Sequence, residues 1–196
     1  MEKSKRNLYL ILNKPYGVLS NFTDSDGRPT LKSYVPVPGV YAAGRLDFDS
    51  EGALILTNDG DLISKITQPV HHIPKTYWVM VLGEITDKAL VDLSNGVIIE
   101  GVKTRRCSVM EIPDPGLVER DIAGTRKGAV CWLQIILREG RKRQVRRMTA
   151  AVGLPTLRLF RAAIGNVTVE GLDPGEWRYL TAEEVESLRR GSWRHR

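Results

Sequence analysis

Short apolar stretches of strand length recur along this chain without the regular alternation of strand and helix that builds a parallel sheet. Apolar, β-branched and aromatic stretches predict strands at 7–12, 18–20, 53–57, 75–82, 129–137, 156–163 and 166–169, and two short strands within 97–111. Helical patterns are fewer, and they predict helices at 61–67, 86–94, 141–152 and from Thr181 onward. Many strands interrupted by few helices favour an α+β fold with a largely antiparallel sheet flanked by helices.

Length and composition restrict the domain organisation. The 196 residues are 42% apolar and 27% charged, as is typical of a globular protein with one good core. We expect a single domain over 1–196, with a core at about 7–188 and a basic tail at 189–196. Cys107 and Cys131 stand in no metal-ligand spacing, so we expect no structural zinc site and no disulfide scaffold. The sequence shows no signal peptide and no apolar run of membrane-spanning length, and we expect a cytoplasmic protein with no membrane contact.

Positive charge is concentrated toward the end of the chain. The formal net charge is +6, and six of the ten residues from Arg138 to Arg147 are Arg or Lys. Four further arginines lie between Arg189 and Arg196. Clustered charge of this kind favours a phosphate-bearing partner such as a nucleic acid, although a solvated helix face would also carry it.

Asp47 is the first candidate for chemistry. It follows Arg45 and Leu46 in a turn that leads into the predicted strand 53–57. A carboxylate at the mouth of a buried strand is costly to desolvate unless a cation meets it. Arg45 and the later arginine cluster can supply that cation, so the pattern indicates a reactive carboxylate in a basic cleft.

Three kinds of site could use this segment. A calcium loop of the EF-hand type would need a bidentate Glu at its twelfth position, where this chain has Asn58. A phosphatase of the aspartyl-phosphate type would need its apolar strand before Asp47, whereas the apolar run follows it. The third kind is an aspartate that acts on a sugar as a nucleophile or by its charge.

Five segments resemble the motifs of the pseudouridine synthase group that comprises type A for small-subunit ribosomal RNA and types B, E and F for large-subunit ribosomal RNA. In chain order they lie at 13–17 (NKPYG), 44–60 (GRLDFDSEGALILTNDG), 75–77 (KTY), 139–148 (EGRKRQVRRM) and 159–165 (LFRAAIG). Most members of this group carry an N-terminal RNA-binding module of the S4 type, but here the catalytic part begins at about residue 7. Residues 49–52 (DSEG) resemble type E, which lacks that module. The resemblance implies the pseudouridine synthase catalytic fold with a central basic active-site cleft.

The resemblance also implies an activity. Members isomerise uridine in RNA to pseudouridine, with no cofactor and no metal, and large-subunit ribosomal RNA (23S) is the favoured substrate here. The matching positions make Asp47 the catalytic aspartate, Arg146 its basic partner and Tyr77 the aromatic that stacks on the flipped-out uridine. Trp78 should lie on the opposite face of the strand and pack in the core.

Basic residues within or near the motifs are candidates for contacts to the RNA: Lys14, Arg45, Arg141, Lys142, Arg143, Arg147 and Arg161. The resemblance implies a monomer, and nothing in the sequence suggests an oligomer. A non-catalytic ribosomal RNA-binding or assembly factor on the same scaffold is the alternative function. The same reaction on small-subunit or transfer RNA is also open, because the motifs for chemistry do not discriminate between RNA substrates.

Overall fold

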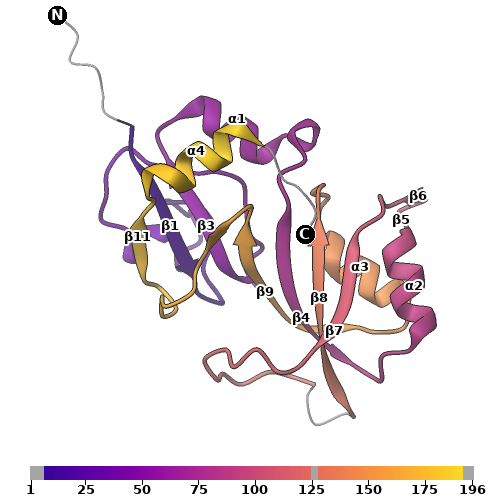
Figure 1. The fold of residues 1–196 in the computed structure, drawn as a ribbon. Coiled ribbons are helices and arrows are strands. Elements are labelled where there is room, and N and C mark those ends of the chain that lie inside the picture. Colours follow the sequence, from indigo (N-terminus) through magenta and orange to yellow (C-terminus); the bar gives the residue numbers. More distant parts are fainter. Residues whose placement is uncertain (1–6, 125–127, 192–196) are drawn as a thin grey trace, which may run out of the picture. The chain divides into compact units, whose positions relative to one another are not determined.

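A computed structural model describes residues 7–124 and 128–191 (Figure 1). The chain divides into two compact units, one made of 1–73 with 165–196 and the other of 74–164. Within each unit the paired strands run antiparallel, so the predicted α+β class is confirmed.

The first unit is built on a small sheet. Strand β1 (Tyr9–Lys14) pairs with β11 (Trp177–Tyr179) and with β3 (Glu51–Thr57), and β3 also pairs with β2 (Tyr41–Ala42). The remaining elements are η1 (Leu31–Ser33), α1 (Gly60–Thr67), η2 (Pro69–His71), β10 (Val167–Thr168) and α4 (Ala182–Arg190). Alternate leucines of β1 and β3 form one core cluster with Leu31 and Val40, as period-two burial requires.

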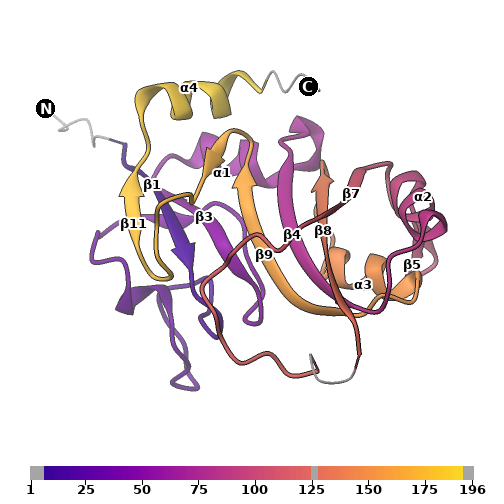
Figure 2. The same cartoon turned by 60° about the horizontal axis from the view of Figure 1, so that its bottom comes forward.

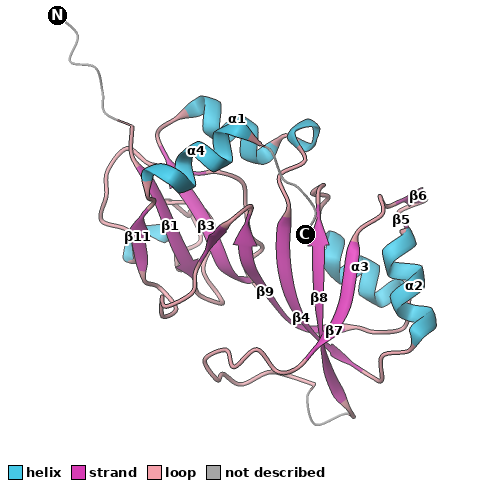
Figure 3. Cartoon of the chain, in the orientation of Figure 1, coloured by secondary structure: helices cyan, strands magenta, loops and turns pink. Residues whose placement is uncertain are grey.

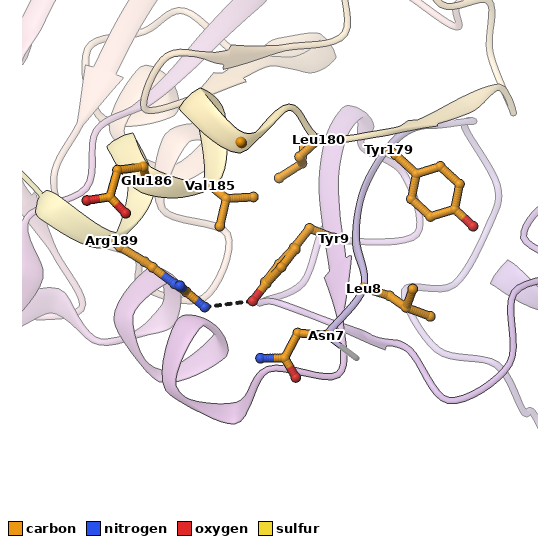
Figure 4. A pocket seen from close by; sticks show the side chains of 9 residues that line it. Asn7, Leu8, Tyr9, Tyr179, Leu180, Val185, Glu186 and Arg189 are labelled. Atoms are coloured by element: carbon orange, nitrogen blue, oxygen red, sulfur yellow. Dashed lines mark hydrogen bonds between the residues drawn. The ribbon is translucent and has the colours of Figure 1, made fainter. Parts of the chain in front are cut away.

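Helices α1 and α4 lie side by side, and their capping residues follow the sequence signals (Figure 1). The Thr181 hydroxyl accepts from the Glu184 amide, and the Glu184 carboxylate accepts from the Thr181 amide, which confirms the predicted capping box. The Asp59 carboxylate caps α1 by accepting from the Leu62 amide at 3.1 Å. The Asp59 carboxylate also accepts a hydrogen bond from the Arg189 guanidinium at 2.8 Å. The same guanidinium donates to the Tyr9 hydroxyl at 2.6 Å (Figure 4).

Arg189 changes the predicted boundary of the tail. The basic tail was expected to begin at residue 189, but α4 continues through Arg190, and Arg189 is tied to Asp59. An ion pair that joins two helices fixes the last turn of α4 to the fold. Residues 192–196, which hold the rest of the predicted tail, lie outside the described residues.

The second unit is built on a four-strand sheet. Strand β4 (Lys75–Leu82) lies between β8 (Val130–Leu137) and β9 (Thr156–Ile164), and β7 (Ser108–Ile112) pairs with β8 (Figures 1 and 2). Helices α2 (Asp87–Asn95) and α3 (Gln144–Ala151) lie together beside this sheet, as Figure 3 shows, and a short hairpin joins β5 (Ile98–Ile99) to β6 (Val102–Lys103). Val79, Leu133, Ile135, Leu93 and Met148 are buried in one core between the sheet and the helices.

Two segments differ from the sequence prediction. Helix α3 begins at Gln144 instead of residue 141, because Arg143 has a left-handed backbone (φ 51°) that ends the preceding turn. The strand expected at 18–20 is a single bridge from Leu19 to Thr30. The short strand β11 carried no clear sequence pattern, because its three residues derive their conformation from pairing with β1.

No helix in the described part of the chain is both long enough and apolar enough to span a membrane.

Candidate active site

Asp47 lies in the first unit, in the connection from β2 to β3. The Ser50 amide closes a turn there by donating to the Asp47 carbonyl at 3.1 Å. Leu46 before it is buried and Phe48 after it is exposed, whereas Asp47 itself is half-buried. The buried neighbour anchors the turn in the core, and the half-buried position leaves the carboxylate part of its hydration, which lowers the cost of placing a charge there.

The main chain on both sides of Asp47 is held by residues 17–20 of the same unit. The Gly17 amide donates to the Phe48 carbonyl at 2.9 Å. The Ser20 hydroxyl accepts from the Leu46 amide at 3.0 Å and donates to the Leu46 carbonyl at 2.8 Å. Three hydrogen bonds therefore fix the residues that flank the aspartate.

Lys14 does not have the place expected of an RNA contact. Its side chain is 0% exposed, and its ammonium donates to the carbonyls of Pro15 and Val18 at 2.8 and 2.7 Å. A buried ammonium needs such acceptors, because an unmet charge in the interior is costly. Lys14 therefore stabilises the turn that follows β1, and its burial does not support the predicted contact with RNA.

Tyr77 lies in the second unit, on β4. It is 9% exposed and belongs to the core on the face covered by α2 and α3. Its direct partner across the strands is Arg161 on β9, next to a register shift between Thr76 and Tyr77. Trp78 lies on the opposite face, as strand alternation predicts, and stacks on Phe160 with the ring centroids 5.6 Å apart.

Arg161 is likewise less accessible than expected. Only 3% of it is exposed, which does not support a contact with an RNA backbone. Its charge also affects Lys75, two residues before Tyr77. Burial first, and the nearby Arg161 guanidinium second, lower the pKa of Lys75 to about 8. Sequence reasoning placed Lys75 in the KTY motif but gave it no role.

Arg146 lies in the first turn of α3 and is half-buried. Its guanidinium donates to the Thr156 carbonyl at the start of β9, at 3.3 Å. The Thr149 hydroxyl lies 2.7 Å from the Thr156 hydroxyl and donates to the Arg146 carbonyl at 3.2 Å. The Arg146 carbonyl is thus bonded within α3, and its guanidinium is bonded to β9. These two bonds restrict the directions in which the guanidinium can point.

The loop before α3 is organised by two residues to which sequence reasoning gave no role. The buried Gln144 side chain accepts from the Arg141 amide at 3.0 Å and donates to Glu139 at 2.5 Å. The same Glu139 carboxylate accepts from the Arg105 amide at 3.0 Å. The sequence signal for this loop was the spacing of Glu139 and Gln144 in the EGRKRQ segment. Both side chains can accept hydrogen bonds from backbone amides where the chain bends at Arg143.

Two of the predicted RNA contacts are anchored to the β5–β6 hairpin. The Arg141 guanidinium donates to the carbonyls of Ile99 at 3.0 Å and Val102 at 3.3 Å, and Arg147 forms an ion pair with Glu100 at 2.5 Å. The carbonyls position Arg141 and leave its charge unneutralised, because a carbonyl carries no net charge. Arg147, in contrast, is paired with a carboxylate. Arg45 and Lys142 are exposed, and Arg143 is half-buried.

The structure thus gathers the predicted residues in two groups. The first unit holds Asp47 with its flanking segment, and the second holds Tyr77, Arg146 and Arg161 on β4, α3 and β9. Within the second unit the strand pairing brings Tyr77 opposite Arg161. Each unit therefore contributes its own part of the predicted chemistry.

Comparison with known proteins agrees with the resemblance seen in the sequence. Residues 8–151 match the family described as RNA pseudouridylate synthase. A protein of Vibrio vulnificus named ribosomal large subunit pseudouridine synthase E is 50% identical over 188 residues, which are 92% of this chain and 80% of that protein. A protein of the same name from Xanthomonas campestris is 48% identical over 187 residues, with 93% of this chain and 100% of that protein covered.

The fold comparison gives the same result. A solved structure described as a crystal structure of pseudouridylate synthase superposes with a TM-score of 0.78 at 31% identity, over 95% of this chain and 75% of that one. The family match spans more than half of the chain, and the 48–50% identical relatives are matched over most of their own length. This chain therefore belongs to the RNA pseudouridylate synthase family, enzymes that isomerise uridine within RNA.

Proposed function

We propose that this protein converts uridine to pseudouridine in large-subunit ribosomal RNA. The observation that carries the choice of substrate is the 48–50% identity to proteins named ribosomal large subunit pseudouridine synthase E, across at least four-fifths of their length. That likeness extends over at least 92% of this chain and is therefore not limited to the five motifs. We further propose that the enzyme is a cytoplasmic monomer whose two units act as one catalytic domain.

The reaction is an isomerisation in which atoms and electrons balance within the nucleotide. The N1–C1′ bond of the uridine breaks, the base turns, and C5 bonds to C1′. The proton on C5 leaves, and N1 gains one. In our proposal the Asp47 carboxylate acts at C1′, or at the C2′ proton if the sugar passes through a glycal. Both routes use the ionised carboxylate.

Arg146 and Tyr77 take the roles that the resemblance to the family implies. A guanidinium stabilises an ionised carboxylate and aims it through two parallel donors of one planar group, a geometry that lysine lacks. The attachment of Arg146 to Thr156 supports this role, because it limits the directions that the guanidinium can take. Flipping the uridine out of its helix or loop costs a few kcal/mol. Stacking on the Tyr77 ring returns about 1–3 kcal/mol of that cost.

The proposed RNA-binding face is smaller than the sequence suggested. Five basic residues stay in it after Lys14 and Arg161 are set aside as buried: Arg45, Arg141, Lys142, Arg143 and Arg147. Neutralising about five phosphates of single-stranded RNA gives a slope near −3.5 for log K against log salt concentration. A measured slope near zero would contradict a basic binding face.

The experiment that tests the function measures tritium release from ribosomal RNA labelled at C5 of uridine. Unmodified large-subunit RNA should release tritium with the wild-type enzyme and not with Asp47→Asn, which should remain folded and bind RNA equally well. Small-subunit RNA and transfer RNA serve as comparison substrates, and release from either of them instead would overturn the choice of large-subunit RNA. No release from any of the three RNAs or from ribosomal assembly particles, with binding intact, would support the non-catalytic assembly factor.

A further inference from the structure

Ser20 is a buried serine whose hydroxyl serves a single residue, Leu46. The hydroxyl accepts from the Leu46 amide at 3.0 Å and donates to the Leu46 carbonyl at 2.8 Å. Ser20 and Leu46 are each 7% exposed, so water does not compete for these bonds. The Leu46 amide belongs to the peptide group that follows Arg45, and the Leu46 carbonyl belongs to the one that leads into Asp47. One side chain therefore fixes both peptide planes before the aspartate.

On the other side of Asp47, two main-chain hydrogen bonds hold the backbone. The Gly17 amide donates to the Phe48 carbonyl at 2.9 Å, and the Ser50 amide donates to the Asp47 carbonyl at 3.1 Å. No side-chain substitution removes these two bonds directly. Loss of the Ser20 side chain would thus release the backbone on the N-terminal side of Asp47.

Ser20 is itself held firmly enough to act as a support. Its neighbour Leu19 donates to the Pro29 carbonyl at 2.9 Å and bridges to Thr30. The turn before it is closed by the Lys14 ammonium, which binds the Val18 carbonyl at 2.7 Å. A residue that supports another must itself be held by packing and hydrogen bonds, and these contacts restrain the segment that carries Ser20.

From this geometry we infer that Ser20 is a positioning residue for Asp47, which sets the direction from which the carboxylate approaches the ribose. The inference rests on the proposed function, in which Asp47 acts on the sugar. Catalysis by a positioned group is sensitive to placement, and an error of about 1 Å costs on the order of 10²-fold in rate. Ser20 therefore contributes to the chemical step without touching the substrate.

The test compares two deletions of a buried hydroxyl from the same region. Ser20→Ala removes both bonds to Leu46. Ser50→Ala is the matched control, because the Ser50 hydroxyl is buried and has no hydrogen-bond partner among residues 7–124 and 128–191. We expect Ser20→Ala to lower the single-turnover rate at least 10-fold, with less than a 2-fold change in RNA affinity, and Ser50→Ala to change either quantity less than 2-fold.

Hydrogen exchange provides a second readout that does not depend on the reaction. The Leu46 amide should exchange faster in Ser20→Ala than in the wild type, and it should be unaffected in Ser50→Ala. A purely structural role for Ser20 would lower the melting temperature and leave the rate per folded molecule unchanged. That result would overturn the inference, as would wild-type exchange at Leu46 in Ser20→Ala.

The two proposals fail in different ways. If the wild-type enzyme releases tritium and Asp47→Asn does not, but Ser20→Ala keeps the wild-type rate, the positioning role is wrong and the proposed function stands. If the wild-type enzyme releases no tritium from any RNA, the proposed function fails, and the exchange experiment still decides whether Ser20 fixes the backbone before Asp47.

Discussion

Replacing Gly96 by alanine should destabilise the second unit through a contact that the sequence does not reveal. Gly96 ends α2 with φ 86°, and a Cβ added there would overlap the carbonyl oxygen of Thr104. Two hydrogen bonds join the same chain segments, from the Thr104 amide to the Val97 carbonyl at 2.9 Å and from the Val97 amide to the Thr104 hydroxyl at 3.0 Å. To relieve the overlap, the chain must move away from Thr104 and weaken both bonds.

The magnitude follows from two contributions. A backbone with a positive φ costs an alanine about 1–3 kcal/mol relative to glycine. The two hydrogen bonds contribute about 1 kcal/mol each to the free energy of unfolding. Gly101→Ala is the matched control, because Gly101 also has a positive φ (77°) but nothing lies within 4 Å of its added Cβ. We expect Gly101→Ala to lower the free energy of unfolding by the backbone contribution only. Gly96→Ala should lower it by about 2 kcal/mol more.

Urea unfolding of the two variants and the wild type, followed by circular dichroism, measures this difference. In a thermal melt it corresponds to roughly 4–8 °C between the variants, at about 2–4 °C per kcal/mol for a chain of this size. Equal losses in the two variants, within about 0.5 kcal/mol, would refute the reasoning, because they would show that the contact with Thr104 contributes nothing. The hairpin beyond Gly96 also holds Arg141 through the carbonyls of Ile99 and Val102, so RNA affinity should fall in Gly96→Ala as well.

Three further outcomes are expected from single changes, each measured by urea unfolding. The pKa of Glu184 is lowered, first by the hydrogen bonds from Arg178, so Glu184 stabilises the fold above its ordinary pKa of 4.5 and loses this contribution as the pH falls below that value. Glu184→Gln should therefore make the free energy of unfolding depend less on pH below 4.5. An unchanged pH dependence would contradict the ion pair. The pKa of Lys75 is lowered to about 8, so at Lys75 the unfolded chain binds more protons between pH 8 and the ordinary pKa of 10.5, and the stability of the wild type relative to Lys75→Met should rise with pH across that interval. Leu133 is 0% exposed in the core of the second unit, so Leu133→Ala should cost about 2–5 kcal/mol, and a loss below about 1 kcal/mol would mean that the core refills the cavity.

The sequence predicted those elements whose conformation is set by neighbours along the chain. Strand β4 begins and ends where its β-branched and aromatic run does, at Lys75 and Leu82, because alternate residues of that run supply one face of the core. Thr86 and Thr181 cap α2 and α4 as expected, since a cap depends on a side chain and an amide only three residues apart.

Elements that depend on distant partners were predicted less well. Strand β11 forms through its pairing with β1, more than 160 residues earlier in the sequence, and its own three residues carry little periodicity. The start of α3 was placed three residues too early, because Arg143 adopts a left-handed backbone within a loop organised by Glu139 and Gln144. A helical pattern in the sequence does not reveal such a loop.

The sequence by itself determined the family, the α+β class and the identity of the residues proposed for the chemistry: Asp47, Tyr77 and Arg146. These conclusions depend on residue types in a fixed order, which the chain displays directly. Only the tertiary structure decided which charges are accessible. In the sequence Lys14 and Arg161 cannot be told from their basic neighbours, but the fold buries both. Ser20 contacts Leu46 only in the folded chain, because the two residues are 26 positions apart. Burial and hydrogen bonding between distant segments are properties of the packed chain, and for that reason no local pattern encodes them.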